Sequence, residues 1–153
     1  MKEESGIFMP WDEQYSIGIG LVDRQHKELL RLTNMLHSAC REGSTAAQGA
    51  FQSTVHALVD YVQVHFATEE KLMRQFRFTG MEDHLNEHRE FVRTVLDKVR
   101  VFQKGELFVP LAFTGFLKEW IIGHIARADK KLGTYIVGVV RREAMARRPP
   151  DAT

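Results

Sequence analysis

The chain of 153 residues is poor in several features that define common classes of protein. It has one cysteine, Cys40, which cannot form an internal disulfide, so a disulfide-stapled fold is excluded and a reducing compartment is expected. No apolar run approaches the roughly 20 residues that a membrane span needs. A formal net charge of +1 gives no electrostatic basis for binding nucleic acid. The acidic N-terminus lacks the apolar stretch of a secretory signal, so we expect a cytoplasmic protein.

What the chain does have is helical periodicity. Apolar residues recur at steps of three and four along four segments, which predicts helices at about 22–41, 46–77, 81–103 and 110–140. Asp23 is a candidate cap of the first helix, and Pro110 suits the first turn of the fourth. Short connections favour antiparallel neighbours. We therefore predict an all-α, up-down-up-down four-helix bundle, with residues 1–153 as one domain. An irregular N-terminal arm (1–21) should pack on the bundle, and a solvated, basic tail should begin at about 141.

Ionisable residues interrupt the apolar stripes of all four predicted helices. Burying them costs several kcal/mol unless something inside the bundle satisfies them, and a pair of transition-metal ions would do so. One His-x-x-x-Glu pair, His65 and Glu69, and one His-x-x-x-His pair, His84 and His88, occur. In each pair the spacing of four residues places both side chains on one helix face, within reach of one ion. The candidate metal ligands are His26, His65, Glu69, His84, His88, His124 and Asp129.

The other two histidines are not candidate ligands. His56 should point about 180° away from His65 around their helix, and so into solvent. His37 shares the face of His26 but lies three turns away along the axis, which is too far to bind the same ion. We expect it to be an ordinary core residue.

The fourth helix changes phase between His124 and Asp129. The step of five residues would turn the two side chains about 140° apart on a regular α-helix. One extra residue accommodated in a π-bulge restores the phase, and such bulges cluster at functional sites. We therefore predict a bulge or local unwinding between these two residues.

The number of candidate ligands favours two metal ions. Seven ligands are too many for one tetrahedral zinc. Two six-coordinate ions would be bridged by both carboxylates and by one shared oxo or hydroxo group, which leaves one coordination position open. If His84, His88 and His124 bind one ion, that ion is saturated. The ion bound by His26 and His65 is then five-coordinate and has room for one small ligand.

These residues lie in segments that resemble the hemerythrin family, in particular its single-domain bacterial members, the bacteriohemerythrins. The resemblance runs from about Trp11 to Val139. It rests on DRQHKEL around His26, HFATEEKLM at His65 and Glu69, HLNEH at His84 and His88, and HIARAD at His124 and Asp129.

The resemblance implies a non-haem di-iron centre (Fe2+/Fe3+) with a bridging oxo or hydroxo ligand. The chain would then bind dioxygen reversibly at the five-coordinate iron, for storage, transport or delivery, and would not be an enzyme. Ile121, one turn before His124 on the same face, should cover the open coordination position. In the family this place is usually occupied by a bulky aliphatic residue.

Two other functions compete with oxygen binding. A ferritin-like di-iron oxidase would use Glu-x-x-His motifs, and the chain contains none. An oxygen or redox sensor would act through a separate signalling partner, just as delivery would need an oxygen-consuming enzyme. We expect a monomer that binds no nucleic acid and does not insert into membranes.

The ligand histidines should be oriented by hydrogen bonds from their second ring nitrogens. The nearby polar candidates for accepting these bonds are Asp23, Gln25 and Glu70, together with backbone carbonyls.

Overall fold

The computed structural model describes residues 6–42, 45–104 and 110–150, apart from the side chains of residues 42, 45–48 and 50. Its main helices are α1 (Gly20–Glu42), α2 (Thr45–Gln75), α3 (Met81–Gln103), α4 (Pro110–His124) and α5 (Lys130–Ala146). Two short elements complete the order, the 3-10 turn η1 (Glu13–Tyr15) before α1 and the π-helical turn η2 (Ile125–Asp129) between α4 and α5. No strand occurs in these described ranges.

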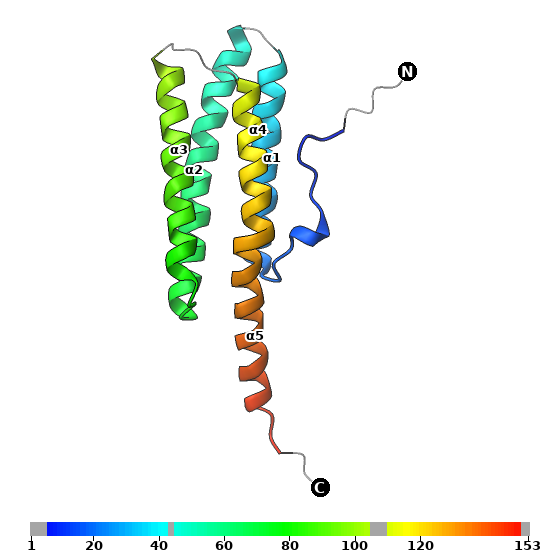
Figure 1. Cartoon of the computed structure of the whole chain (residues 1–153). Coiled ribbons are helices and arrows are strands. Elements are labelled where there is room, and N and C mark those ends of the chain that lie inside the picture. Colours follow the sequence, from blue (N-terminus) through cyan, green and yellow to red (C-terminus); the bar gives the residue numbers. More distant parts are fainter. Residues whose placement is uncertain (1–5, 43–44, 105–109, 151–153) are drawn as a thin grey trace.

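The predicted four-helix bundle is confirmed. Figure 1 shows α1, α2, α3 and the α4–α5 rod running alternately up and down, so that each is antiparallel to the next. Apolar side chains fill the interior in two groups of buried residues. The larger group includes Leu36, Leu58, Phe91, Leu117 and Ile121. The smaller one consists of Met73, Leu85, Leu132 and Ile136.

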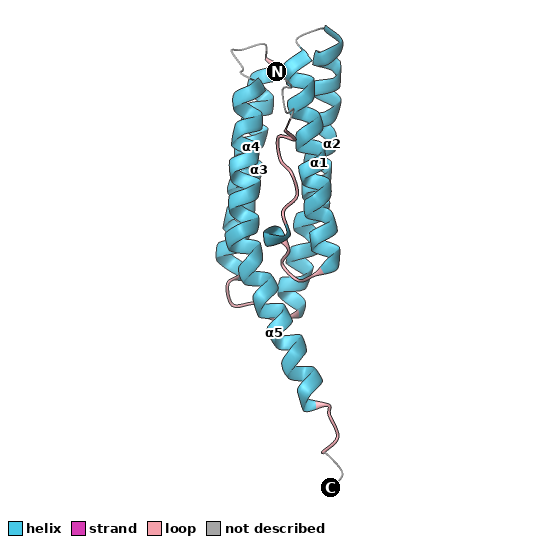
Figure 2. Cartoon of the chain, turned by 90° about the vertical axis from the view of Figure 1, so that its right-hand side faces the viewer, coloured by secondary structure: helices cyan, strands magenta, loops and turns pink. Residues whose placement is uncertain are grey.

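The predicted phase change in the fourth helix is also confirmed. Residues Ile125–Asp129 form a π-helical turn, and α4 and α5 continue the rod on either side of it (Figure 2). The extra residue brings His124 and Asp129 to the same side, and both are buried. A regular helix would have turned one of them away from the bundle.

The last helix continues further than predicted. We expected it to end at about residue 140 and a solvated tail to follow from about 141, but α5 is helical to Ala146 and projects beyond the end of the bundle (Figure 2). All residues from 141 to 150 are exposed, so the expectation of a solvated segment is confirmed. The helix persists because the first strong helix breaker is Pro149. The tail's last residues, 151–153, lie outside the described part.

The N-terminal arm packs on the bundle, as predicted, from residue 6 onward; residues 1–5 are not described. The Asn34 side chain accepts a hydrogen bond from the Met9 backbone nitrogen at 2.8 Å and donates one to the Met9 oxygen at 3.0 Å. Further along, Ile17 is buried against Gly133 of α5. A Cβ added at Gly133 would lie 2.2 Å from the Ile17 carbonyl oxygen. Glycine at this position therefore permits close contact between the arm and α5.

Two other expected helix ends differ from the structure. Asp23 does not cap α1, which begins three residues earlier at Gly20. Instead its carboxylate binds the arm, accepting from the Ile17 backbone nitrogen at 2.8 Å and from the Ser16 hydroxyl at 2.6 Å. Helix α2 ends at Gln75 and not at residue 77, because Arg77 adopts a positive φ of 52° in the turn that precedes α3.

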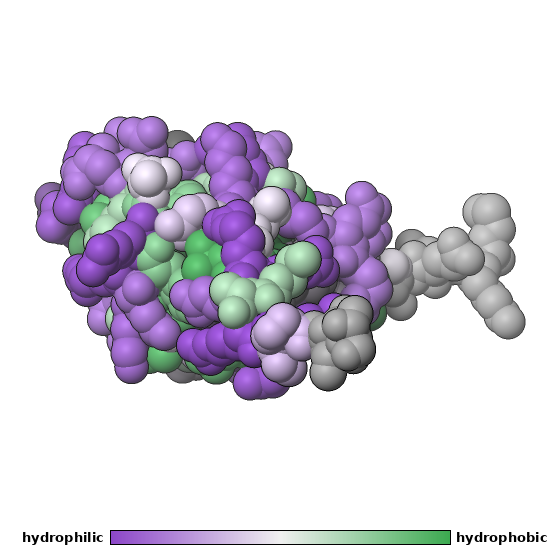
Figure 3. Space-filling view, turned by 90° about the horizontal axis from the view of Figure 1, so that it is seen from below, coloured by the Kyte–Doolittle hydropathy of each residue, from purple (hydrophilic) through white to green (hydrophobic). Residues whose placement is uncertain are grey.

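Seen from the end where α5 projects, the surface is largely hydrophilic, with small apolar areas between polar side chains (Figure 3). None of the helices in the described residues is long and apolar enough to cross a membrane.

Candidate metal centre

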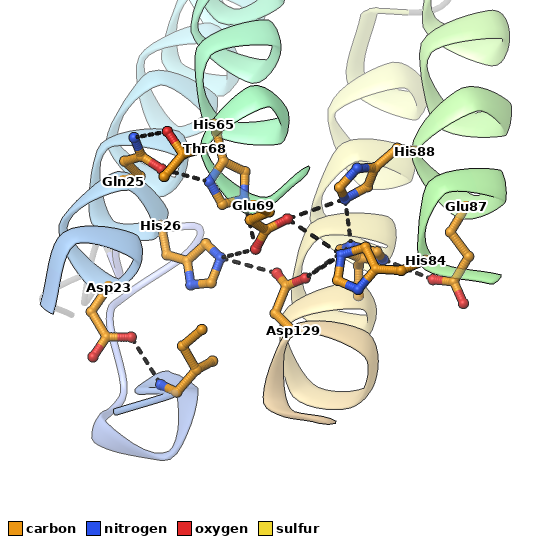
Figure 4. A network of polar contacts seen from close by, with 12 residues as sticks. Asp23, Gln25, His26, His65, Thr68, Glu69, His84, Glu87, His88 and Asp129 are labelled. Atoms are coloured by element: carbon orange, nitrogen blue, oxygen red, sulfur yellow. Dashed lines mark hydrogen bonds and ion pairs between the residues drawn. The ribbon is translucent and has the colours of Figure 1, made fainter. Parts of the chain in front are cut away.

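The seven predicted ligands come together inside the bundle, between its two apolar groups. Figure 4 labels all of them except His124. Helix α1 supplies His26, α2 supplies His65 and Glu69, and α3 supplies His84 and His88, while His124 and Asp129 flank the π-helical turn. Every one of them is at most 3% exposed. The sequence pattern predicted this convergence correctly, because each residue lies in phase with the apolar stripe of its helix.

The two carboxylates lie between two groups of histidines, and each presents one oxygen to either group. Glu69 Oε1 lies 3.6 Å from His65 Nε2, whereas its Oε2 lies 3.1 Å from His88 Nε2. Asp129 Oδ2 lies 3.0 Å from His26 Nε2, whereas its Oδ1 lies 3.0 Å from His124 Nε2. This is the arrangement in which a carboxylate bridges two cations.

The donor atoms fit a pair of metal ions. One group of ligand atoms within 4.8 Å of one another comes from Glu69, His84, His88, His124 and Asp129, and a second comes from His26, His65, Glu69 and Asp129. Glu69 belongs to both groups, and its buried carboxylate oxygen Oε1 has no hydrogen-bond partner among the described residues. Buried polar atoms are rarely left unsatisfied. The cluster therefore has the donor atoms and the spacing to hold metal ions.

Burial shifts the protonation of the metal-free cluster. It raises the pKa of Glu69 to about 8, helped by the charge of Asp129, and it lowers the pKa of His65 to about 3. Although burial acts in the opposite direction, hydrogen bonds with Asp129 and Glu69 raise the pKa of His84 to about 9. Burial would also raise the pKa of Asp129, but hydrogen bonds from His124, His26 and His84 hold it well below its usual range. The cluster thus favours few charges when it holds no cation.

Two of the five histidines have a side-chain partner at their outer nitrogen. His65 Nδ1 lies 3.0 Å from Gln25 Oε1, and Gln25 in turn donates to Thr68. His124 Nδ1 lies 2.7 Å from Glu87 Oε2. Of the three partners predicted from sequence, only Gln25 is correct.

The other two predicted partners are engaged elsewhere, Asp23 with the arm and Glu70 with Arg74. Glu87 was missed because its partner is 37 residues away on another helix. Its position in HLNEH, directly before a ligand histidine, was the one available signal.

Aromatic rings also hold the ligand imidazoles, and sequence reasoning missed this role. Phe66 stacks on His88 with ring centroids 3.6 Å apart and planes within 7°. Trp120 stacks on His124 at 4.4 Å and 13°. In the sequence, Phe66 directly follows His65, and Trp120 lies one turn before His124. The stacked rings restrict the rotation of the His88 and His124 imidazoles.

The two remaining histidines lie away from the cluster, as expected. His56 is exposed. His37 is half-buried, stacks on Phe8 of the arm at 3.8 Å, and lies 3.3 Å from the Thr114 hydroxyl.

The model of the hemerythrin HHE cation-binding domain matches residues 17–136, which include all seven clustered residues. The chain belongs to the hemerythrin family. A bacteriohemerythrin of Methylococcus capsulatus is 31% identical over 126 residues, covering 82% of this chain and 94% of the relative. A bacteriohemerythrin of Pseudomonas aeruginosa is 34% identical over 119 residues, covering 78% of this chain and 75% of the relative.

Solved hemerythrin structures have the same fold. A crystal structure of wild-type hemerythrin, 30% identical, matches with a TM-score of 0.77 and covers 83% of this chain and 96% of its own. A leucine-to-alanine variant of hemerythrin matches with a TM-score of 0.79 at 29% identity, with 85% and 98% covered. The part of this chain beyond residue 136, which includes the end of α5, lies outside the matched family domain.

Proposed function

We propose that this hemerythrin binds dioxygen reversibly at a non-haem di-iron centre. The observation that carries the proposal is the placement of Glu69 and Asp129, each with one oxygen toward either group of histidines. In the proposed centre, His84, His88 and His124 would hold one iron, His26 and His65 would hold the other, and Glu69 and Asp129 would be shared between them. A ferrous pair held there with an oxo or hydroxo group would supply the two electrons that reversible dioxygen binding needs.

The ligand composition favours oxygen binding over oxidation of a substrate. Hemerythrins bind oxygen and are not enzymes. Five neutral imidazoles and only two carboxylates stabilise ferric ions less than the four glutamates of a ferritin-like oxidase would. A less stabilised ferric state favours the return of intact dioxygen.

The apolar surroundings support reversibility because they exclude water. Met73 and Leu132 are fully buried on one side of the cluster, and Ile121 is 1% exposed on the other. We propose that Ile121, one turn before His124, is the wall that faces the open coordination position. An apolar wall there would keep water and anions from the reactive pair while admitting a small apolar gas.

We propose a cytoplasmic protein whose single domain spans the chain and works as a monomer. Its role would be to store, transport or deliver dioxygen, with an oxygen-consuming enzyme as the partner in delivery. Sensing through a signalling partner is the alternative, and α5 beyond the matched domain is where such a partner could bind.

The proposal is tested by loading the protein with ferrous iron under nitrogen and then cycling it between air and nitrogen. We expect two irons per chain by metal analysis, with a charge-transfer band in the near-ultraviolet and visible that appears in air and disappears when oxygen is removed. Irreversible oxidation with product turnover would instead identify an oxidase.

A pair of variants tests the bridging role. Glu69→Ala should abolish binding of the second iron. Glu70→Ala is the matched control, because the adjacent Glu70 carboxylate bonds to exposed Arg74 and lies outside the cluster. If Glu69→Ala still held two irons, the bridging role would be wrong.

A further inference from the structure

Glu87 forms the shortest polar contact that any ligand histidine makes outside the cluster. Its Oε2 lies 2.7 Å from His124 Nδ1, within the range of a charge-assisted hydrogen bond. When Nε2 of His124 faces a metal ion, Nδ1 carries the proton, and the Nδ1–H group donates a hydrogen bond to this carboxylate. Figure 4 shows Glu87 on α3 at the outer side of the cluster.

A bidentate ion pair holds Glu87 in place. Arg127 Nη1 donates to Glu87 Oε1 at 2.6 Å, and Nη2 donates to Oε2 at 2.9 Å. Arg127 lies in the π-helical turn, so this pair connects α3 to the turn that places His124 and Asp129. The guanidinium thus contacts both oxygens of the carboxylate and pairs it with a positive charge.

The other half of the cluster has a neutral counterpart. His65 Nδ1 faces the carboxamide oxygen of Gln25 at 3.0 Å, and Gln25 is itself held by the Thr68 hydroxyl. A carboxylate acceptor draws the imidazole proton more strongly than an amide does, so it makes the ring a better electron donor to a metal. The two halves therefore differ in the charge of their outer acceptor.

We propose that Glu87, clamped by Arg127, is a positioning residue that makes the His84–His88–His124 half of the centre the tighter and more electron-rich metal site. This proposal deepens the di-iron function and rests on it. The half with His26 and His65, which is supported by an amide, is then the site with weaker donors.

Cobalt(II) titration monitored by absorption tests the proposal without redox chemistry. Glu87→Gln removes the charge but keeps the shape, and it should raise the Kd of one of the two binding steps by about 10–100-fold. The other step should stay within about threefold. His124→Ala identifies which step belongs to this half of the centre. Arg127→Gln should give a smaller loss in the same step, because the carboxylate remains but is no longer clamped.

Two comparisons separate positioning from a merely structural role. Glu90→Gln makes the same change of charge on the exposed face of α3 and should leave both steps unchanged. Gln25→Ala should raise the Kd of the other binding step, that of the His26–His65 half.

In the iron-loaded protein, the redox potential gives a further measurement. A tenfold greater loss of ferric than of ferrous affinity in Glu87→Gln would raise the one-electron potential by about 59 mV.

Glu87 and Arg127 are partly exposed, with side chains 28% and 58% accessible, so Glu87→Gln should fold. Circular dichroism checks this, and Arg127→Gln serves as the second variant if it does not. Equal Kd values in Glu87→Gln and Glu90→Gln, or an equal loss in both steps, would overturn the positioning role. A wild-type chain that takes up fewer than two cobalt ions would overturn the di-iron function itself, and this proposal with it.

Discussion

In the metal-free protein, the free energy of unfolding should fall as the pH rises from about 6.5 to 9. The cause is the raised pKa of two buried groups, Glu69 at about 8 and His84 at about 9. In the unfolded chain, Glu69 has lost its proton near its ordinary value of 4.5, and His84 loses its own near 6.5. In the folded state, both groups keep their protons to a higher pH. Raising the pH through this window therefore favours the unfolded chain.

The magnitude follows from the size of the shifts. One proton held only by the folded state changes stability by about 1.36 kcal/mol per pH unit. Between pH 6.5 and its folded pKa of about 8, Glu69 alone accounts for a loss of about 2 kcal/mol. His84 contributes in the same direction, and because the groups interact we expect a total of about 2–5 kcal/mol. Proteins of this kind have about 5–15 kcal/mol in all.

Urea denaturation of the chelated protein at pH 6.5, 7.5 and 8.5 measures this loss. Glu69→Gln cannot titrate and should flatten the profile by the share of one proton, whereas the exposed Glu90→Gln should leave it unchanged. The metal-loaded protein should not lose stability over this range, because metal replaces the protons and its affinity rises with pH. A metal-free profile that is level or rises with pH would refute the assignment of protons to the buried cluster.

Further predictions concern the metal, the wall and the arm. Chelation should lower the melting temperature by about 5–11 °C, since free metal at 100 times its Kd adds about 2.7 kcal/mol and each kcal/mol shifts Tm by about 2–4 °C; calorimetry with and without chelator checks this. Ile121→Ala should speed autoxidation and ease azide binding in optical assays. Leu117→Ala, equally buried but one turn further from His124, should cost similar stability without either effect. Gly133→Ala should destabilise the protein by about 1–3 kcal/mol and expose the arm to proteases, because its Cβ would meet the Ile17 oxygen at 2.2 Å. Gly115→Ala has no atom within 4 Å of its Cβ and should be neutral or stabilising.

The local pattern of the chain was sufficient to predict the helices and the composition of the site. Helical phase is a property of neighbouring residues, so the stripes identified His65 and Glu69 as one inward-facing pair and His84 and His88 as another. The five-residue step from His124 to Asp129 predicted the π-helical turn for the same reason, because a buried residue out of phase needs a local change of geometry.

Helix ends were predicted less well, since they depend on contacts outside the helix. Asp23 has the composition of a cap, but the arm competes for its carboxylate, and α1 begins earlier at Gly20. At the other end of the chain, α5 continues to Ala146 although its residues from 141 onward are exposed, because these residues are themselves compatible with a helix.

Only the tertiary structure decided what lies around the ligands. The partner of His124 is Glu87, 37 residues away, and the partner of His65 is Gln25, 40 residues away. Such contacts depend on the rotation and height of two helices relative to each other, which periodicity along one helix does not specify. The sequence thus determined which residues face the centre of the bundle. The packing of the helices determined which carboxylate, amide or ring lies behind each of them, and so how the two halves of the centre differ.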